Sequence, residues 1–560
     1  MKRIALTIAI LLSISVLRAQ TKYQQPMDIQ PLLSASYAEL RANHFHSGID
    51  ITTSGATGIA VRAVADGYVS RINVSAYGYG HALYITHYDG NTTVYAHLNS
   101  YAPKIDSVIT AEQYRRKSFT VDYENLPKDL ITVKRGEVVA YSGNTGGSGG
   151  PHLHFEVRDT ESEEPLNPLA YLPKITDNVA PTVYGIKIYA IDDNSQVSGE
   201  CADKYFKLNE IADKTIQACG RIGFGIHAND FFTGGRRPCG VVEVSLYDGD
   251  DLLFQSRLDR FHFDETRYIN SFIDYAEYQT NKRYIQKSFV EPNNRLRIYN
   301  AQNDFNISAG EERKMRYVLK DFAGNKTEVR FTVAGKKNAN AKTRQHAGYK
   351  VSWDKTWAID TLNASVLIPS SSLYRDEYIS ISTSNSKTYS QPVYSVGSER
   401  IPLQKKATIT IPVPPTIKKL IGRTVKPQQV FAAQLNSKNK ISYAGGTYEG
   451  GNVTLKTQSL GDYVIAVDTI APKVFSKNTR TDLVGKNSVM VGLADDMSGI
   501  DKYNCYINDE WKLFQYDYKN TRLISRVDKL NLKAGKHKLK AVVEDTCGNE
   551  TVFEWDFTTK

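Results

Sequence analysis

Seven of the eleven histidines in this 560-residue chain lie between residues 44 and 154, far more than an even spread would place there. They are His44, His46, His81, His87, His97, His152 and His154. Histidine gathers at zinc sites and at proton-transfer sites, because imidazole binds metal when neutral and changes charge near neutral pH. This stretch is therefore expected to fold around a metal or a reacting group.

Four of these histidines fall into three short clusters. The clusters are His46-Ser-Gly-Ile-Asp50, Tyr95-Ala-His97-Leu98, and the glycine-rich run Gly143–Gly150 followed by Pro151-His152-Leu-His154-Phe-Glu156. In a strand over residues 151–158, His152 and His154 project from one face. One of these histidines can then bind a metal while the other lies beside the open coordination position of that metal. A catalytic zinc takes three protein ligands and a water, and His46, Asp50 and His154 supply that number and those atom types.

These motifs resemble those of the lysostaphin-type (beta-lytic, LytM-like) zinc endopeptidases. The HxGxD motif of that family matches His46 to Asp50, its HxH motif matches His152 to His154, and its intermediate histidine matches His97. The resemblance covers residues 41 to 157. It implies one zinc ion per chain, bound by His46, Asp50 and His154, with His97 and His152 as catalytic residues. It also implies hydrolysis of peptide bonds in bacterial peptidoglycan, chiefly in stem-peptide cross-links.

Some residues near these motifs are harder to assign. No HExxH glutamate is present, so the imidazoles take the part that glutamate plays in zincins. Glu156 shares strand parity with His152 and His154 and stays open as a further acid–base candidate. Tyr79 is expected either to line a substrate groove or to pack in the core or on the surface without a functional role. Residues 99–134 form a longer link than compact family members use, and this insertion is expected to wall the groove or to control access.

The local patterns predict a mainly β chain. His81–Tyr88 and Asn91–His97 flank Asp89-Gly90, a strong hairpin signal, and Ala60–Ala65 and Tyr68–Ile72 flank Asp66-Gly67 in the same way. Tyrosine is abundant, at 35 residues, and no long segment has helical periodicity. We expect an antiparallel-sheet, LytM-like peptidase domain over residues 20–172.

The rest of the chain carries an internal repeat. Asp177-Asn-Val-Ala-Pro resembles Asp468-Thr-Ile-Ala-Pro, and Asp321-Phe-Ala-Gly-Asn resembles Asp545-Thr-Cys-Gly-Asn. Two such matches in the same order predict two β-sandwich modules of immunoglobulin or fibronectin-III type, over residues 173–335 and 468–560. Between them, residues 336–467 are expected to form a polar linker and a further β-rich module.

The first 19 residues have the features of a cleaved secretory signal. Lys2 and Arg3 precede an apolar run from Ile4 to Val16, and cleavage is expected after Ala19, with an uncleaved anchor as the alternative. No other apolar run is long enough to span a membrane, so none is expected after cleavage. The chain is then expected in the periplasm, in the cell envelope or outside the cell. The net charge of +10 suits anionic wall polymers or simple solubility, and no nucleic-acid motif accompanies it.

The five cysteines include no CxxC pair, so they do not indicate a structural zinc ribbon. Export permits disulfides, and Cys505 and Cys547 are either a disulfide of the last module or two unpaired thiols.

The sequence thus predicts an exported, zinc-dependent endopeptidase of peptidoglycan, whose β-modules bind the wall or other envelope proteins. Two alternatives stay open. One is a catalytically silent regulator or scaffold of other cell-wall hydrolases, and the other is an envelope adhesin.

Overall fold

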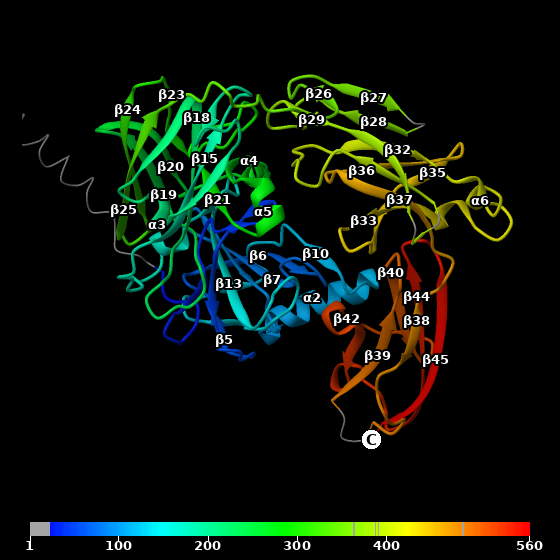
Figure 1. Ribbon diagram of the computed structural model, residues 1–560. Coiled ribbons are helices and arrows are strands. Elements are labelled where there is room, and N and C mark those ends of the chain that lie inside the picture. The colour runs from blue at the N-terminus through cyan, green and yellow to red at the C-terminus, as the bar shows by residue number, and fades with distance from the viewer. Residues whose placement is uncertain (1–22, 362–363, 387, 390, 484–486, 560) are drawn as a thin grey trace, which may run out of the picture.

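The computed structural model describes residues 23–361, 364–386, 388–389, 391–483 and 487–559. The expected signal segment lies outside these residues. The chain is mostly β, as predicted, and forms four β-rich parts in chain order (Figure 1). We call them the first domain (to residue 172), the first module (173–335), the middle module (336–467) and the C-terminal module (468–559). Within the described residues, no helix is long and apolar enough to cross a membrane.

A nine-stranded, antiparallel sheet forms the centre of the first domain. Its main path runs through β1 (Leu33–Ala35), β4 (Ile49–Thr52), β13 (His152–Asp159), β8 (Asn91–Ala96), β7 (His81–His87), β6 (Gly67–Val74) and β10 (Val121–Tyr123). The β7–β8 hairpin confirms the prediction made from Asp89-Gly90. The predicted strand over residues 151–158 is confirmed as β13.

The central strand β13 has one apolar and one polar buried face. Leu153, Phe155 and Val157 point into the core, while the alternate side chains, His154 among them, are polar and also buried. Buried polar groups must find partners, so this face is a place where polar side chains converge. The register sets His154 opposite Asp50 of β4 and opposite Ala96 of β8.

A second sheet of three strands, β5 (Ala60–Arg62), β12 (Val138–Tyr141) and β9 (Ser100–Tyr101), flanks the first. The expected hairpin around Asp66-Gly67 is wrong in its pairing, because β5 pairs with β12 while β6 pairs with β7. The turn at Asp66 therefore passes the chain from one sheet to the other.

The segment 99–134 contains the longest helix, α2 (Pro103–Arg116), among the described residues. Proline in its first turn and arginines in its last turn suit the two helix ends. The segment then adds β10 and β11 (Thr132–Val133), which both pair with β6.

Three further β-rich parts follow. The first module has an eleven-stranded sheet with the main path β17 (Lys204–Lys207), β15 (Thr182–Ala190), β18 (Thr215–Asn229), β25 (Lys326–Gly335), β24 (Glu312–Lys320), β19 (Glu243–Asp248), β20 (Asp251–Arg257) and β22 (Tyr299–Gln302). The middle module has two five-stranded sheets. The first is β27 (Trp357–Thr361), β28 (Ala364–Ile368), β32 (Ala407–Pro412), β36 (Asn452–Thr457) and β35 (Thr447–Glu449). The second is β30 (Ile381–Asn385), β31 (Pro392–Val396), β37 (Gly461–Val467), β33 (Val430–Leu435) and β34 (Ile441–Gly445).

The C-terminal module has two four-stranded sheets. They are β38 (Lys473–Ser476), β39 (Ser488–Ala494), β43 (Arg522–Arg526) and β42 (Gln515–Asp517), and β41 (Glu510–Trp511), β40 (Ile500–Ile507), β44 (Gly535–Asp545) and β45 (Glu550–Thr559). Of the two alternatives for Cys505 and Cys547, the structure shows unpaired thiols, and both lie buried in separate apolar clusters.

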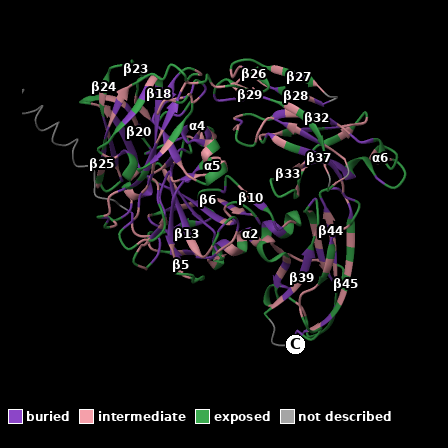
Figure 2. Cartoon of the chain, viewed as in Figure 1, coloured by how far each residue is buried: buried purple, intermediate pink, exposed green. Residues whose placement is uncertain are grey.

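The core of the first domain continues into the first module (Figure 2). Phe45, directly before His46, packs against Phe261 and Phe272 of the first module, with ring centroids 5.3 and 6.1 Å apart. Tyr37 stacks on Phe261 at 5.6 Å. The turn that carries His46 is therefore supported from across the boundary at residue 172.

The C-terminal module folds back onto the first domain beside α2 (Figure 1). Lys529 forms a 2.8 Å ion pair with Asp106 of α2. Tyr518 donates a 3.2 Å hydrogen bond to the carbonyl of Gly146, and Lys519 donates a 2.7 Å bond to the carbonyl of Asn144. The glycine-rich loop before His152 is thus held by residues more than 370 positions later in the chain.

Replacing Phe261 with alanine is expected to destabilise the first domain as well as the first module. The lost burial and the cavity should cost about 3–5 kcal/mol of unfolding free energy. Hydrogen exchange followed by mass spectrometry should show faster exchange in peptides covering residues 44–52. The matched control is Phe475→Ala in the C-terminal module, where the ring is largely exposed and exchange at 44–52 should not change. Unchanged exchange in Phe261→Ala would contradict a shared core.

Candidate metal centre

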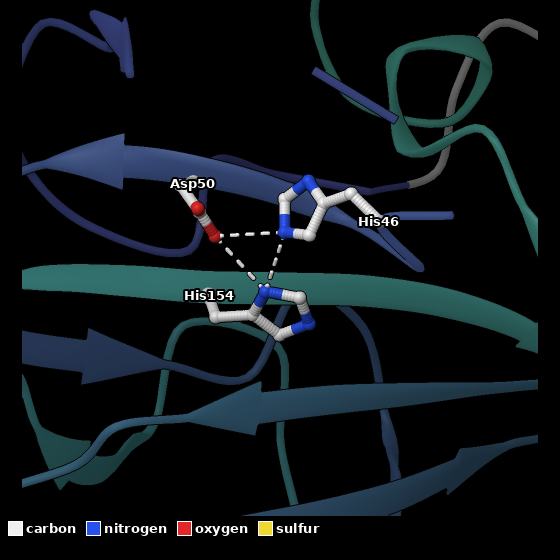
Figure 3. Close-up of side chains that lie close together, drawn as sticks. All are labelled: His46, Asp50 and His154. Atoms are coloured by element: carbon white, nitrogen blue, oxygen red, sulfur yellow. Dashed lines mark hydrogen bonds and ion pairs between the residues drawn. The ribbon is translucent and has the colours of Figure 1, made fainter. Parts of the chain in front are cut away.

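Three side chains converge where β4 and β13 lie side by side (Figure 3). His46 precedes β4, Asp50 lies on it, and His154 lies opposite Asp50 on β13. His46 Nε2 is 2.9 Å from His154 Nδ1 and 3.0 Å from Asp50 Oδ1, and Oδ1 is 2.9 Å from His154 Nδ1. All three side chains are buried. The structure therefore brings the three predicted ligands to one point.

In His46 and His154, the ring nitrogen that points away from Asp50 contacts a hydrogen-bond acceptor, and this contact sets the tautomer of each ring. His46 Nδ1 lies 2.7 Å from the carbonyl oxygen of Ser36, and His154 Nε2 lies 2.7 Å from Glu156 Oε1. Both nitrogens must donate, so neutral His46 and His154 turn their lone pairs toward Asp50.

Facing lone pairs of this kind need a cation or a proton between them. Burial disfavours a charge on His154, but Asp50 and Glu156 outweigh it and raise the pKa of His154 to about 9. His46 is different, because its burial lowers the pKa despite Asp50. A metal ion would take the place of the His154 proton, since metal binding releases protons from its ligands.

The donor set fits zinc. Two imidazole nitrogens and one carboxylate oxygen match the ligands of catalytic zinc sites, which keep a fourth position open. With ligands at about 2.0–2.2 Å from a tetrahedral ion, neighbouring ligand atoms lie about 3.4 Å apart. The three atoms here lie within 3.0 Å of one another, so a few tenths of an ångström of outward movement accommodates the ion.

Glu156 holds His154 in place and does not face the open side of the centre. Its carboxylate is fully buried and accepts hydrogen bonds from His154, Tyr79 (2.6 Å) and Ser47 (2.5 Å), and from Arg158 Nε at 2.7 Å. Burial favours the neutral acid, yet Arg158 and His154 hold the pKa of Glu156 far below its ordinary value. Partners of this kind fix the orientation of a ligand and raise its basicity.

His97 and His152 lie together beside the three converging side chains. Their ring centroids are 4.8 Å apart, and the ring of His97 is 5.8 Å from that of His154. His97 Nδ1 donates to the carbonyl of Thr145 at 2.9 Å, and His152 Nδ1 donates to that of Gly150 at 2.8 Å. Each neutral ring therefore keeps its lone pair on Nε2, and His152 Nε2 lies 3.4 Å from Asp50 Oδ1.

Two features of His97 are typical of a functional position. Its φ of 59° is left-handed, which is uncommon for a residue other than glycine. Burial, together with His154 and His152, lowers the pKa of His97 to about 3, so its imidazole is neutral at pH 7.

Glycines let the chain segments approach closely around the centre. A Cβ on Gly48, inside the HxGxD motif, would collide with the carbonyl oxygen of Phe155 on β13. Gly146 has a φ of 66°, and a Cβ there would collide with the backbone of Gly80. Glycine is therefore required between the first two ligands and in the loop before His152.

The other histidines of the first domain lie away from this centre. His44 is exposed and contacts the carbonyl of Ala42. His81 is half-buried and packs against Tyr101 and Phe119, and His87 bonds to Asp66 and Thr93.

Sequence reasoning missed Arg41, Ser36 and the supporting role of Glu156. Arg41 Nη2 donates a 2.9 Å hydrogen bond to Asp50 Oδ2, so the other carboxylate oxygen, Oδ1, faces His46 and His154. No local pattern marks Arg41 or Ser36. The alternation His154, Glu156, Arg158 on a strand with an apolar opposite face is the signal that could have indicated the supporting role of Glu156.

Comparison with known proteins supports the resemblance. Peptidase family M23 matches residues 44–114 and 126–168, and a Zu5-like domain matches residues 348–468. The DD-carboxypeptidase/endopeptidase Mpg of Neisseria meningitidis serogroup B is 33% identical over 125 residues, 22% of each chain. The murein hydrolase activator NlpD of Escherichia coli is 33% identical over 129 residues, 23% of this chain and 26% of NlpD. The lysostaphin-type, LytM-like assignment of the first domain is confirmed by the family match.

Among solved structures, the catalytic domain of lysostaphin from Staphylococcus simulans is similar, with 23% identity and a TM-score of 0.19. That match covers 25% of this chain and 91% of the lysostaphin domain. The chain spans only about a quarter or less of the length of the curated relatives named above. The family match is interrupted at residues 115–125, within the segment 99–134.

The purified chain should bind about one zinc ion, measured by plasma mass spectrometry after dialysis. His46→Ala, Asp50→Ala and His154→Ala should each lower the zinc content severalfold, because each removes one of three ligands. His44→Ala is the matched control, since this exposed histidine lies two residues before His46, and it should keep its zinc. Full zinc content in all three ligand variants would disprove the assignment.

Proposed function

We propose, from the peptidase family M23 domain that residues 44–168 contain, that this chain is a zinc-dependent endopeptidase of bacterial peptidoglycan. The observation behind the proposal is the convergence of His46, Asp50 and His154 on one point. Beside it lie the ring of His152 and the ring of His97, which is neutral at pH 7. A binding module or an adhesin has no need of such a set.

The residues around the centre have distinct parts in peptide hydrolysis. Zinc, when bound by His46, Asp50 and His154, polarises a carbonyl and lowers the pKa of a water. His97 and His152 would accept a proton at Nε2 and return it to the leaving amine, because Nδ1 of each ring is already bonded to a backbone carbonyl. Both can also donate from protonated Nε2 to a developing oxyanion.

Peptidoglycan is the proposed substrate because of the relatives. Mpg is named as a DD-carboxypeptidase/endopeptidase and NlpD as an activator of murein hydrolases, and each is 33% identical to this chain, over 125 and 129 residues respectively. We place the chain in the cell envelope on the strength of the signal-like residues 1–19 and of those relatives. Stem-peptide cross-links are the proposed bonds, and the β-modules would hold the chain on the wall or on other envelope proteins.

The second candidate function is that of a silent activator of other hydrolases. The match to NlpD favours it. An activator of this kind has no requirement for His97 or His152, and this separates the two functions.

His97→Ala and His152→Ala should keep most of the zinc but lose at least about a hundredfold in the rate of peptidoglycan hydrolysis, the usual contribution of positioned acid–base groups. Release of soluble fragments from purified peptidoglycan gives the rate, and metal analysis gives the zinc content. His44→Ala serves again as the control and should match the wild type.

Two results would reject the enzyme. One is an unchanged rate in both variants. The other is a wild-type chain that releases no fragments by itself yet stimulates a separate wall hydrolase equally well with and without His97.

A further inference from the structure

Three aspartates outside the candidate metal centre form a second convergent set. Asp177 lies before β15, Asp230 follows β18 directly, and Asp321 lies in the turn between β24 and β25. One carboxylate oxygen from each lies within 4.8 Å of the others, and all three side chains are buried. They come from three separate segments of the first module and meet at the end that faces the first domain.

Among the described residues, no positive charge balances these carboxylates, because none of the three forms an ion pair and their hydrogen-bond donors are neutral. Asp177 accepts from Val179 and Thr233, and Asp321 accepts from Gly324 and Asn325. Three buried carboxylates with oxygens within 4.8 Å of one another repel one another, and neutral donors compensate only part of that cost.

Asp230 shows where the missing partner belongs. Its side chain is only 2% exposed, and its Oδ1 has no hydrogen-bond partner among the described residues. Burial and the neighbouring Asp321 and Asp177 raise the pKa of Asp230 to about 7. A buried, unpartnered carboxylate oxygen beside two other carboxylates is an unsatisfied ligand position.

We propose that Asp177, Asp230 and Asp321 bind a calcium ion. Calcium takes hard oxygen ligands at about 2.3–2.6 Å, and oxygens of one coordination shell lie within about 5 Å of one another, as these do. The set contains no imidazole or thiolate, so it does not suit zinc. Magnesium is a poorer fit, because it demands near-octahedral geometry and keeps most of its water.

The same ion would support the candidate metal centre. Asp230 and Cys239 pair through both backbone hydrogen bonds and close the loop 231–238. The next residue, Gly240, donates a 2.9 Å hydrogen bond to Ser36 Oγ, and the carbonyl of Ser36 accepts from His46 Nδ1. Calcium at Asp230 would therefore fix a chain of contacts that ends on a predicted zinc ligand.

The C-terminal module repeats much of this arrangement. Asp468, Asp495 and Asp545 occupy the corresponding positions, and Asn549 bonds to the carbonyl of Asp468 as Asn325 bonds to that of Asp177. Asp495 differs from Asp230, because it is only half-buried and its Oδ2 accepts from two backbone amides. Asp495 therefore offers a matched control position, and the inference concerns the first set alone.

Isothermal titration of the zinc-loaded, full chain with calcium chloride tests the site. Wild-type protein should bind calcium saturably, with a Kd of about 10⁻⁴–10⁻³ M or tighter, and its Tm should rise. Asp230→Asn keeps the shape but removes the charge, so it should bind one calcium fewer than the wild type. Asp495→Asn should bind as many calcium ions as the wild type. Asp177→Asn is the second variant and should behave as Asp230→Asn does.

Thermal unfolding distinguishes an ion ligand from an ordinary buried aspartate. Without calcium, Asp230→Asn should be at least as stable as the wild type, because it removes repulsion. With calcium, the wild type should be the more stable protein. No saturable binding by the wild type, an unchanged stoichiometry in both Asp230→Asn and Asp177→Asn, or equal binding of magnesium would overturn the inference.

Discussion

The buried hydrogen bond between His154 and Glu156 is the interaction on which the candidate metal centre depends. It lies on the polar face of β13, whose other face is apolar from Leu153 to Val157, so the strand cannot shift register without burying Leu153 and Phe155 among charges. Arg158 neutralises Glu156 from the same face, and Glu156 in turn directs the lone pair of His154 at Asp50. One strand thus fixes the position, the tautomer and the electrostatic environment of a predicted ligand.

Support for the other ligands comes from farther along the chain. Phe261 packs under the turn of His46, and Gly240 bonds to Ser36, which orients the His46 ring. Separate β-modules usually have separate hydrophobic cores, and the contacts between the modules are usually more polar. Here aromatic side chains of the first module complete the apolar core of the first domain. The strands of the first module enclose a second, separate core, but these aromatic side chains make the stability of the first domain depend on the first module.

Much of the first domain could be predicted from sequence, because its signals are local. Asp89-Gly90 gave the hairpin β7–β8, and the HxH spacing on a strand gave the face from which His152 and His154 project. The turn at Asp66-Gly67 led to a wrong strand pairing, because turn residues indicate where the chain reverses but not which strands pair. The partner of β5 is β12, which lies over 70 residues away in the sequence. Arg41, Ser36 and Tyr518 could not be predicted, because their roles arise only when distant segments meet. The repeat indicated corresponding aspartates in two modules but not that those of the first module are buried together without a counter-charge.

The hydrogen bond from Tyr518 to Gly146 joins residues 372 positions apart, and this has a consequence for the order of folding. Contacts of such long range form late, because the intervening chain must first be ordered. During synthesis, and in any passage across a membrane, residues 44–168 emerge long before residue 518. The loop before His152 therefore gains its last support only when the C-terminal module has folded. A chain cut short before that module would keep its histidines but would lack the contacts of Tyr518 and Lys519 that hold the loop before His152.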